Sequence, residues 1–424
     1  MRRYENYKPS GIPWIEDVPN HWNIVPNRSI LKLKKSFVGE TSKDYALLSL
    51  TKQGVIPRDM ENLEGKVPAS FDTYQVIEQG DLIFCLFDID ETPRAVGISD
   101  LDGMITSAYT RFTCDPSLAK YTYYFYLAMD NNKRLKPLYT GLRKTIQKNA
   151  FLSAKLPLPP LEEQRAIVRY LDKKLEQIDT FIQNKRRLIA LLEEQKSALI
   201  NRAVTKGLDE GVKMKDSGVK WLKKLPKHWE EKRAKYYFKE IDERSATGEE
   251  ELLSVSHKTG VTPRSEKNIT MFKAESYEGY KLCQPGDLVI NIMWAWMGAM
   301  GVSSYTGIVS SSYGVYRQLK TNLYEPEYLD YLIRVSPYVA EYNVRSTGVT
   351  SSRARMYTDD FFDMPFIRPP LYEQKDIVSF IKNEAIAFDR GISNANQEIH
   401  LINEYRTTLI SEVVTGKIDV RTAA

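Results

Sequence analysis

Two stretches of the chain carry a narrow apolar stripe in which successive hydrophobic positions are three or four residues apart. The first stripe begins at Leu161 and the second at Leu371, and a glycine follows each of them, at Gly207 and Gly416. Steps of three and four give a period near 3.5 residues, which is typical of the contact seam of a coiled coil. Glycine is also the usual residue just beyond a helix end. The pattern predicts two long helices, each roughly 65 Å long at ~1.5 Å per residue.

Polar residues interrupt the two stripes at matching places. Gln164 and Gln374 occupy one seam position near the start of each helix, and Lys196 and Arg406 occupy another near the end. A parallel pair would bring Lys196 beside Arg406, and like charges in a seam are costly. We therefore predict an antiparallel coiled coil in which Gln164 lies near Arg406 and Gln374 near Lys196. The alternative is that these side chains only extend to solvent at the helix ends.

The stripes are part of a duplication that organises the whole chain. Residues 159–205 match residues 369–415 without a gap, and a second match aligns residues 10–22 with residues 217–229. Both copies of the second match contain Pro-x-His-Trp, which we interpret as a structural motif. A fixed offset over this length indicates two similar halves with an internal pseudo-twofold repeat.

The segments between the matches share only sparse anchors, such as the Gly-Asp-Leu turns at Asp81 and Asp287. Short β-rich runs, two short helices and the lack of a βαβ rhythm predict compact α+β domains. We predict an α+β protein with two similar mixed α/β domains separated by two long helices. Its segments are residues 1–156 (first variable domain), 157–211 (first helix and linker), 212–366 (second variable domain) and 367–424 (second helix and tail).

Composition narrows the function without defining it. At 424 residues the chain is too long for one ordinary core, and a net charge of +5 permits nucleic-acid binding without requiring it. Three scattered cysteines argue against a disulfide framework and for a reducing compartment. No apolar run is long enough to cross a bilayer, so we expect a cytoplasmic protein without a membrane partner.

Basic and amide side chains gather in the predicted loops of both variable domains. Arginine and lysine bind guanine edges and phosphates, and glutamine binds adenine edges, so these residues are suited to reading DNA. A solvated charge or a phosphate contact is nevertheless the more common role of any single loop arginine. The candidate DNA-binding residues are Lys52, Gln53, Arg58, Arg111, Arg143, Lys144, Gln147 and Lys148 in the first half and His257, Lys258, Arg264, Arg317, Arg345, Arg353 and Arg355 in the second.

The sequence lacks the common signatures of catalysis. It contains no glycine-rich phosphate loop, no paired cysteine motif and no His-Glu-x-x-His motif. Asp59, Glu64 and Lys66 have a spacing seen in many nucleases, but the second half has no counterpart. We therefore assign no catalytic residue, no metal site and no cofactor to this chain, and we expect a protein that reads DNA without performing a reaction.

The arrangement resembles the DNA-specificity subunits of type I restriction-modification systems over essentially the whole chain. The residues that carry the resemblance are the Leu158–Val168 helix opening, its echo from Pro369, the tryptophan pairs Trp14/Trp22 and Trp221/Trp229, and the turns at Asp81 and Asp287. A Pro-Leu-x-Glu-Gln opening that is duplicated between dissimilar domains is a specific signal, although the second copy has Tyr372 where the first has Glu162.

The resemblance implies a function and a set of partners. In that family each variable domain is a target-recognition domain that reads one half of a split DNA site in the major groove. The long helices hold the half-sites apart and dock two methyltransferase subunits. The resemblance thus implies an asymmetric bipartite site in double-stranded DNA, two methyltransferase subunits and restriction (motor-nuclease) subunits as partners. S-adenosylmethionine, ATP and magnesium would be used by those partners.

Three other interpretations remain open from the sequence. A specificity subunit of a methylation-only defence system would share every feature described above. A coiled-coil scaffold that binds only proteins would show no salt-dependent DNA affinity. A nuclease built on Asp59, Glu64 and Lys66 would cut DNA in the presence of a metal.

Overall fold

The computed structural model divides the chain into two compact units. The first unit comprises residues 1–186 and 396–424, and the second comprises residues 187–395. Each unit contains both strands and helices, and each includes part of both long helices, so the predicted α+β class is confirmed. The structure describes residues 2–59, 70–89, 91–141, 144–219, 221–266, 276–348 and 354–422.

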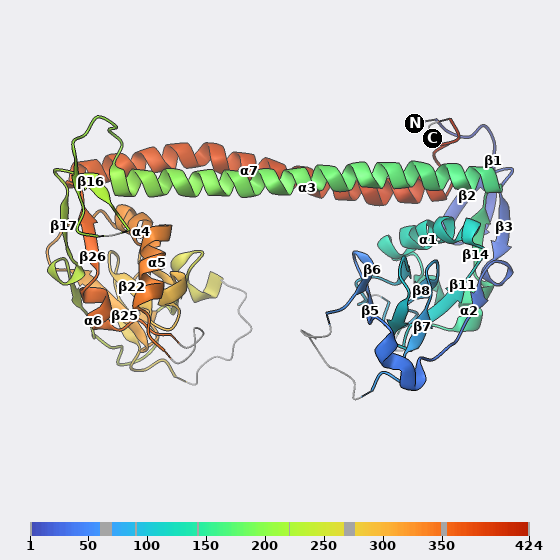
Figure 1. The fold of residues 1–424 in the computed structure, drawn as a ribbon, viewed down its shortest axis with the longest axis horizontal. Helices are drawn as coiled ribbons and strands as arrows, with labels where there is room; N and C mark the ends of the chain where they lie inside the picture. The colour runs from blue at the N-terminus through green and yellow to red at the C-terminus, as the bar shows by residue number, and fades with distance from the viewer. Residues whose placement is uncertain are drawn as a thin grey trace. The chain divides into compact units, whose positions relative to one another are not determined.

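The two predicted long helices are present. Helix α3 spans Leu161–Lys206 and helix α7 spans Leu371–Val414 (Figure 1). Gly207 follows α3 with a φ of 78°, and Gly416 lies two residues beyond α7 with a φ of 76°. These left-handed φ values favour glycine, which explains why a glycine follows each apolar stripe.

Within each unit, the local parts of α3 and α7 run antiparallel. In the first unit Asp179 of α3 is ion-paired with Arg406 of α7, whereas the later residue Lys185 is paired with the earlier residue Glu398. In the second unit Lys196 Nζ lies 2.7 Å from an Asp389 carboxylate oxygen. Rising numbers on one helix thus meet falling numbers on the other, which confirms the predicted antiparallel pair.

The predicted contacts between glutamine and the basic seam residues are wrong. Arg406 and Lys196 instead pair with the carboxylates of Asp179 and Asp389. A carboxylate is a better partner for a cation than a neutral amide, because the interaction is charge-assisted.

Each glutamine is used where its own helix begins. Gln164 is 2% exposed, and its Nε2 donates to the Pro159 carbonyl (2.8 Å). Gln374 is fully buried, and its Nε2 donates to the Pro369 carbonyl (2.8 Å) while its Oε1 accepts from the Glu325 N–H (2.8 Å). The two glutamines therefore fix the chain at each helix start and do not set the pairing of the helices.

The first unit contains a four-stranded antiparallel sheet in the order β4-β11-β8-β9. Helix α1 (Pro116–Asn131) lies between this sheet and the long helices, and its buried side chains share one core with both (Figure 1). The elements of this unit besides α1 are β1 (Tyr7–Ile12), β2 (Ile15–Pro19), β3 (Asn23–Pro26), β4 (Lys32–Leu33), β5 (Leu48–Thr51), β6 (Gly54–Pro57), β7 (Gln75–Ile77), β8 (Leu82–Phe84), β9 (Val96–Ile98), β10 (Gly103–Ile105), β11 (Thr110–Thr113), β12 (Tyr139–Thr140), β13 (Thr145–Ile146), α2 (Lys148–Ser153) and β14 (Lys155–Leu158), with short 3-10 turns between them.

The second unit repeats this plan. Its four-stranded antiparallel sheet has the order β18-β25-β22-β23, and helix α4 (Pro326–Arg334) takes the place of α1. The other elements are β15 (Met214–Asp216), β16 (Lys224–Pro226), β17 (Glu230–Arg233), β18 (Phe238–Glu240), β19 (Leu253–Ser256), β20 (Gly260–Pro263), β21 (Lys281–Cys283), β22 (Leu288–Asn291), β23 (Met300–Val302), β24 (Gly307–Val309), β25 (Tyr313–Gln318), α5 (Ser336–Arg345), α6 (Thr358–Phe362) and β26 (Pro365–Arg368). The duplication seen in the sequence is therefore also a duplication of the fold.

The beginning and the end of the described chain meet in the first unit. The Asp419 N–H donates to the Arg2 carbonyl (2.9 Å), and the Tyr7 hydroxyl donates to the Gly416 carbonyl (3.1 Å). A Cβ at Gly416 would lie 2.3 Å from Pro19, so only glycine fits this close approach.

Candidate nucleic-acid interface

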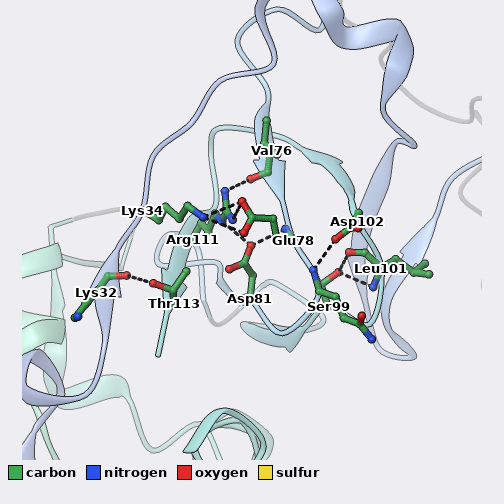
Figure 2. A network of polar contacts seen from close by, with 11 residues as sticks. Lys32, Lys34, Val76, Glu78, Asp81, Ser99, Leu101, Asp102, Arg111 and Thr113 are labelled. Atoms are coloured by element: carbon green, nitrogen blue, oxygen red, sulfur yellow. Dashed lines mark hydrogen bonds and ion pairs between the residues drawn. The ribbon is translucent and has the colours of Figure 1, made fainter. Parts of the chain in front are cut away.

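Arg111 and Arg317, two of the candidate DNA-binding residues, are each paired with the aspartate of a Gly-Asp-Leu turn. Arg111 lies on β11 with a side chain only 1% exposed, and its Nε is 2.6 Å from an Asp81 carboxylate oxygen. Figure 2 shows its guanidinium enclosed by Asp81, Glu78 and the Val76 carbonyl, to which Nη1 donates (2.5 Å). The prediction that Arg111 binds DNA is therefore wrong, because its charge is already neutralised in a buried site.

The same pair recurs in the second unit. Arg317 on β25 donates to both carboxylate oxygens of Asp287, at 2.8 and 2.9 Å, and Asp287 is 1% exposed. Each aspartate also accepts a backbone N–H three residues before it, from Glu78 (2.7 Å) or Gln284 (2.9 Å). The Gly-Asp-Leu turns thus hold an arginine in both units, but the Arg317 side chain is 28% exposed, so DNA binding by Arg317 stays a prediction.

Electrostatics in these networks follow from burial and pairing. Burial raises the pKa of Asp81, and this outweighs the Glu78 N–H and the Arg111 guanidinium, which lower it. Lys34 and Arg111 lower the pKa of the exposed Glu78. Asp287 raises the pKa of the Arg317 guanidinium. Asp81, Arg111 and Arg317 are therefore part of the framework that positions the loops.

A β-hairpin on that framework presents several of the remaining candidates. In the first unit β5 pairs with β6, and the exposed residues Lys52 and Gln53 form the tip. In the second unit β19 pairs with β20, and the exposed residues 257–259 form the tip. One strand hydroxyl holds each tip: Thr51 Oγ1 accepts from the Gln53 N–H (3.1 Å), and Ser256 Oγ accepts in the same way from Thr259 (3.1 Å).

An arginine follows each hairpin. The N–H groups of Arg58 and Arg264 donate to the carbonyls of Leu47 and Leu252, both at 2.8 Å. The Arg58 side chain is exposed and that of Arg264 is half-buried. The run Gly-Val-x-Pro-Arg, residues 54–58 and 260–264, recurs in the sequence and would have linked these arginines, but it was overlooked.

The structure places the other candidates in different surroundings. Gln147 precedes α2, and Lys148 lines a cleft of about 370 Å³ together with Phe37 and Tyr109. His257 lines a cleft of about 750 Å³ with Lys196 and Arg334, and Arg334 Nη2 donates to the Lys258 carbonyl (2.5 Å). Lys144 is exposed with a φ of 45°.

The candidates in the segment after α4 are less easily grouped. Arg345 is ion-paired with Glu341 in α5 (2.7 Å), and Arg355 is exposed while its backbone pairs with Thr347. Arg143 and Arg353 lie outside the described residues.

The repeated Pro-x-His-Trp motif attaches each domain to its long helix. Trp22 Nε1 donates to Glu163 Oε1 (2.9 Å), and His21 Nε2 lies 2.7 Å from Glu163 Oε2. The Tyr4 hydroxyl also donates to Glu163 (2.5 Å), whose side chain is 5% exposed. Glu163 lies in the first turn of α3, where a carboxylate is also favoured by the helix dipole.

The second unit repeats this attachment with fewer contacts. Trp229 Nε1 lies 3.1 Å from both Glu373 oxygens, and His228 Nε2 lies 2.8 Å from Oε2. Glu373 is 19% exposed. These contacts support the structural interpretation of the motif, and the glutamate that receives both donors was not predicted.

A second ion pair joins a short helix of each unit to a long helix, and its positive and negative residues are exchanged between the two units. Lys120 on α1 is paired with Asp172 on α3 (2.7 Å), whereas Glu327 on α4 is paired with Lys382 on α7 (2.6 Å). The neighbouring tyrosine hydroxyls confirm the equivalence of the two helices. Tyr121 donates to the Val414 carbonyl (3.3 Å), and Tyr328 donates to the matching Val204 carbonyl (2.8 Å).

The histidine, cysteine, aspartate and glutamate side chains are dispersed over the residues that the structure describes. Among those residues, no group of three or more His, Cys, Asp or Glu side chains could hold a metal ion. Glu64 and Lys66 of the nuclease-like spacing lie outside the described residues. None of the helices that the structure describes has both the length and the hydropathy of a membrane span.

Two α+β units built on one plan, each including part of an antiparallel pair of long helices, make up the fold. A family model for the Type I restriction modification DNA specificity domain matches residues 108–194. The type I restriction enzyme MjaX specificity subunit of Methanocaldococcus jannaschii is 23% identical over 445 residues, which cover 99% of this chain and 98% of that protein.

Solved structures share the fold. A chain from a type I restriction-modification system, solved to explain complex assembly and conformational transition, has a TM-score of 0.64 at 17% identity and covers 95% of this chain and 99% of that one. The HsdS subunit from Thermoanaerobacter tengcongensis has a TM-score of 0.50 at 15% identity, with 96% and 100% covered. The chain is thus similar to type I restriction-modification specificity subunits, a family that is generally non-catalytic, and the predicted resemblance is confirmed.

Proposed function

We propose that this chain is the sequence-specific DNA-binding subunit of a type I restriction-modification complex. It reads an asymmetric bipartite site in double-stranded DNA, one half with each variable domain. The observation that carries the proposal is the repeated hairpin on a common framework, whose tip is Lys52-Gln53 in one unit and His257-Lys258-Thr259 in the other. Two similar scaffolds with different exposed side chains are suited to two different half-sites.

The long helices dock two methyltransferase subunits in this proposal, and restriction subunits join the same complex. Adenine methylation with S-adenosylmethionine, and cleavage with ATP and magnesium, are reactions of these partners. The chain itself supplies binding and orientation. A methylation-only system would use the chain in the same way but without restriction subunits.

The proposal is tested by co-expressing the chain with the methyltransferase subunit of its own system in a host that lacks DNA methylation. Methylated adenines are then mapped across the genome. We expect one split motif with two different halves and an unread spacer. Exchange of residues 1–156 for the same segment of another specificity subunit should change one half of the motif only.

Two controls give the result its meaning. The first is a Trp22→Ala variant, which removes a donor to Glu163 and shows how methylation changes when the attachment of the first domain to its helix is weakened. The second is the methyltransferase expressed without the chain, which gives the background methylation. Soluble, associated proteins that leave the genome unmethylated would contradict the proposal and favour a scaffold that binds only proteins. A change in both half-sites after exchange of one domain would contradict the modular reading of DNA.

A further inference from the structure

The hairpins separate into a part that is the same in both units and a part that differs. The paired strands match residue for residue, because Leu48 faces Pro57 in the first hairpin and Leu253 faces Pro263 in the second. The two tips differ in both length and composition. The tip is thus the part of the hairpin that differs between the two units, whereas the paired strands are equivalent.

The arginine after each hairpin belongs to the constant part. Arg58 and Arg264 follow the same proline and donate the same backbone hydrogen bond, to Leu47 and Leu252 (2.8 Å each). The Arg58 side chain is exposed and that of Arg264 is partly exposed, so both can reach a ligand. Their surroundings match as well.

A tyrosine lies near each of these arginines at an equivalent position. Tyr109 closes a turn by donating its N–H to Thr106 (3.2 Å), and Tyr313 does the same to Ser310 (2.9 Å). Burial raises the pKa of both tyrosines, and the positive charge of Arg58 or Arg264 partly opposes this effect. Each arginine therefore lies close enough to its tyrosine for the two to interact electrostatically.

The two halves of an asymmetric site differ in bases but share the sugar-phosphate backbone. A residue that both domains hold in the same place is suited to the shared part of the ligand, and residues that differ are suited to the bases. Phosphate contacts fix the register of a protein on DNA, and base contacts supply the specificity. This reasoning rests on the proposed function, because it requires that both domains bind DNA.

We infer that Arg58 and Arg264 are matched phosphate contacts that seat the two domains on the DNA backbone, and that the tips Lys52-Gln53 and His257-Lys258-Thr259 read bases. By binding phosphate, the arginines hold both hairpins at the same distance from the DNA backbone. The tip, held by Thr51 or Ser256, then faces base edges. The two domains thereby differ in sequence preference while docking in one way.

The test uses the full chain with its methyltransferase subunit and a library of duplexes with a randomised central segment. Selection with the wild type gives the preferred sequence, and binding is then measured on that duplex and on an unrelated duplex at several salt concentrations. The variants are Arg58→Gln, Arg264→Gln, the double variant and Arg58→Lys. A further variant replaces the Lys52-Gln53 tip with the three-residue tip of the second hairpin.

The glutamine variants should select the wild-type sequence but bind both duplexes more weakly by one common factor. The slope of log affinity against log salt should become shallower by about 0.9 for each arginine removed. Arg58→Lys should keep the wild-type slope, because lysine binds phosphate as a point charge but lacks the planar fork that pairs with guanine. The tip replacement should change one half-site and leave the slope nearly unchanged.

Several outcomes would overturn the assignment. A changed base preference in Arg58→Gln that Arg58→Lys does not repair would mean that Arg58 reads a guanine. Unchanged affinity and slope in the double variant would mean that neither arginine touches DNA. Unaltered thermal unfolding midpoints exclude misfolding as the cause of any loss. If the wild type itself shows no salt-dependent DNA binding, the proposed function fails and this assignment fails with it.

Discussion

Replacing Arg111 with methionine should strongly destabilise the first unit. Arg111 is 1% exposed and Asp81 is 4% exposed, and the closest atoms of the pair are 2.6 Å apart. Without the guanidinium, the Asp81 carboxylate stays buried with only the Glu78 N–H as a described donor (2.7 Å). Removing one partner of a buried ion pair costs about 3–5 kcal/mol. At about 2–4 °C per kcal/mol for a unit of 150–250 residues, the unfolding midpoint should fall by roughly 6–20 °C.

The loss should depend on pH in a defined direction. Burial already raises the pKa of Asp81, and removal of Arg111 takes away a positive charge that lowers it. A carboxyl whose pKa is higher in the folded than in the unfolded state loses stability as the pH rises through the folded value. The deficit of the variant should therefore be largest at neutral pH and should shrink as the pH falls toward the ordinary carboxyl range.

Scanning calorimetry measures these effects. A variant that destabilises only one unit shows which unfolding transition belongs to that unit. Lys34→Met is the matched control, because Lys34 bonds the same Glu78 but is 40% exposed, and its removal should change stability by less than about 1 kcal/mol. Adding Asp81→Asn to the Arg111 variant should restore part of the loss by removing the unpaired charge. A midpoint within about 2 °C of the wild type, together with lost DNA binding, would refute the structural role and restore Arg111 as a DNA contact.

Two further predictions concern the attachments between the domains and the long helices. Glu163→Ala should lower the free energy of unfolding by about 3 kcal/mol or more, because it leaves the buried donors of Trp22 and Tyr4 without their acceptor. Glu373→Ala should lower it by less, since Glu373 is 19% exposed and accepts from fewer groups. Equal shifts in the two unfolding midpoints would contradict this ranking. Lys120→Glu should lower stability by less than about 1 kcal/mol, because Lys120 is 49% exposed. Adding Asp172→Lys should restore part of the loss, since the second unit carries the pair in that polarity but Asp172 also accepts from the Tyr124 hydroxyl. A double-mutant cycle without coupling would show that the pair contributes nothing.

The elements that could be predicted from the sequence are those specified locally. A 3.5-residue period belongs to one helix at a time, so α3 and α7 follow from their own residues. The antiparallel direction also followed, although the partners chosen for Lys196 and Arg406 were wrong. The register depended on Asp179 and Asp389, which lie outside the predicted stripe but close enough to neutralise the cations.

Long-range pairing explains what the sequence analysis missed at the candidate interface. Arg111 looked like a loop cation because its partner Asp81 is 30 residues away in the chain, and Arg317 and Asp287 have the same separation. That equal spacing in both halves was the signal that each arginine pairs within the protein. The tips at Lys52 and His257 are exposed, as expected for a binding surface.

The first unit is built from two separate segments of the chain, so the second unit can fold before it although the first unit begins the sequence. Its core includes Leu409, Ile410, Val413 and Val414, whereas the second unit is one continuous stretch of the chain. Translation adds about 5–20 residues per second, so residues 1–186 are synthesised roughly ten to forty seconds before residues 396–424. The unit that is encoded later can therefore close first. A chain that stops before residue 396 would carry one finished unit and one exposed apolar core, which is the kind of product that chaperones and proteases remove.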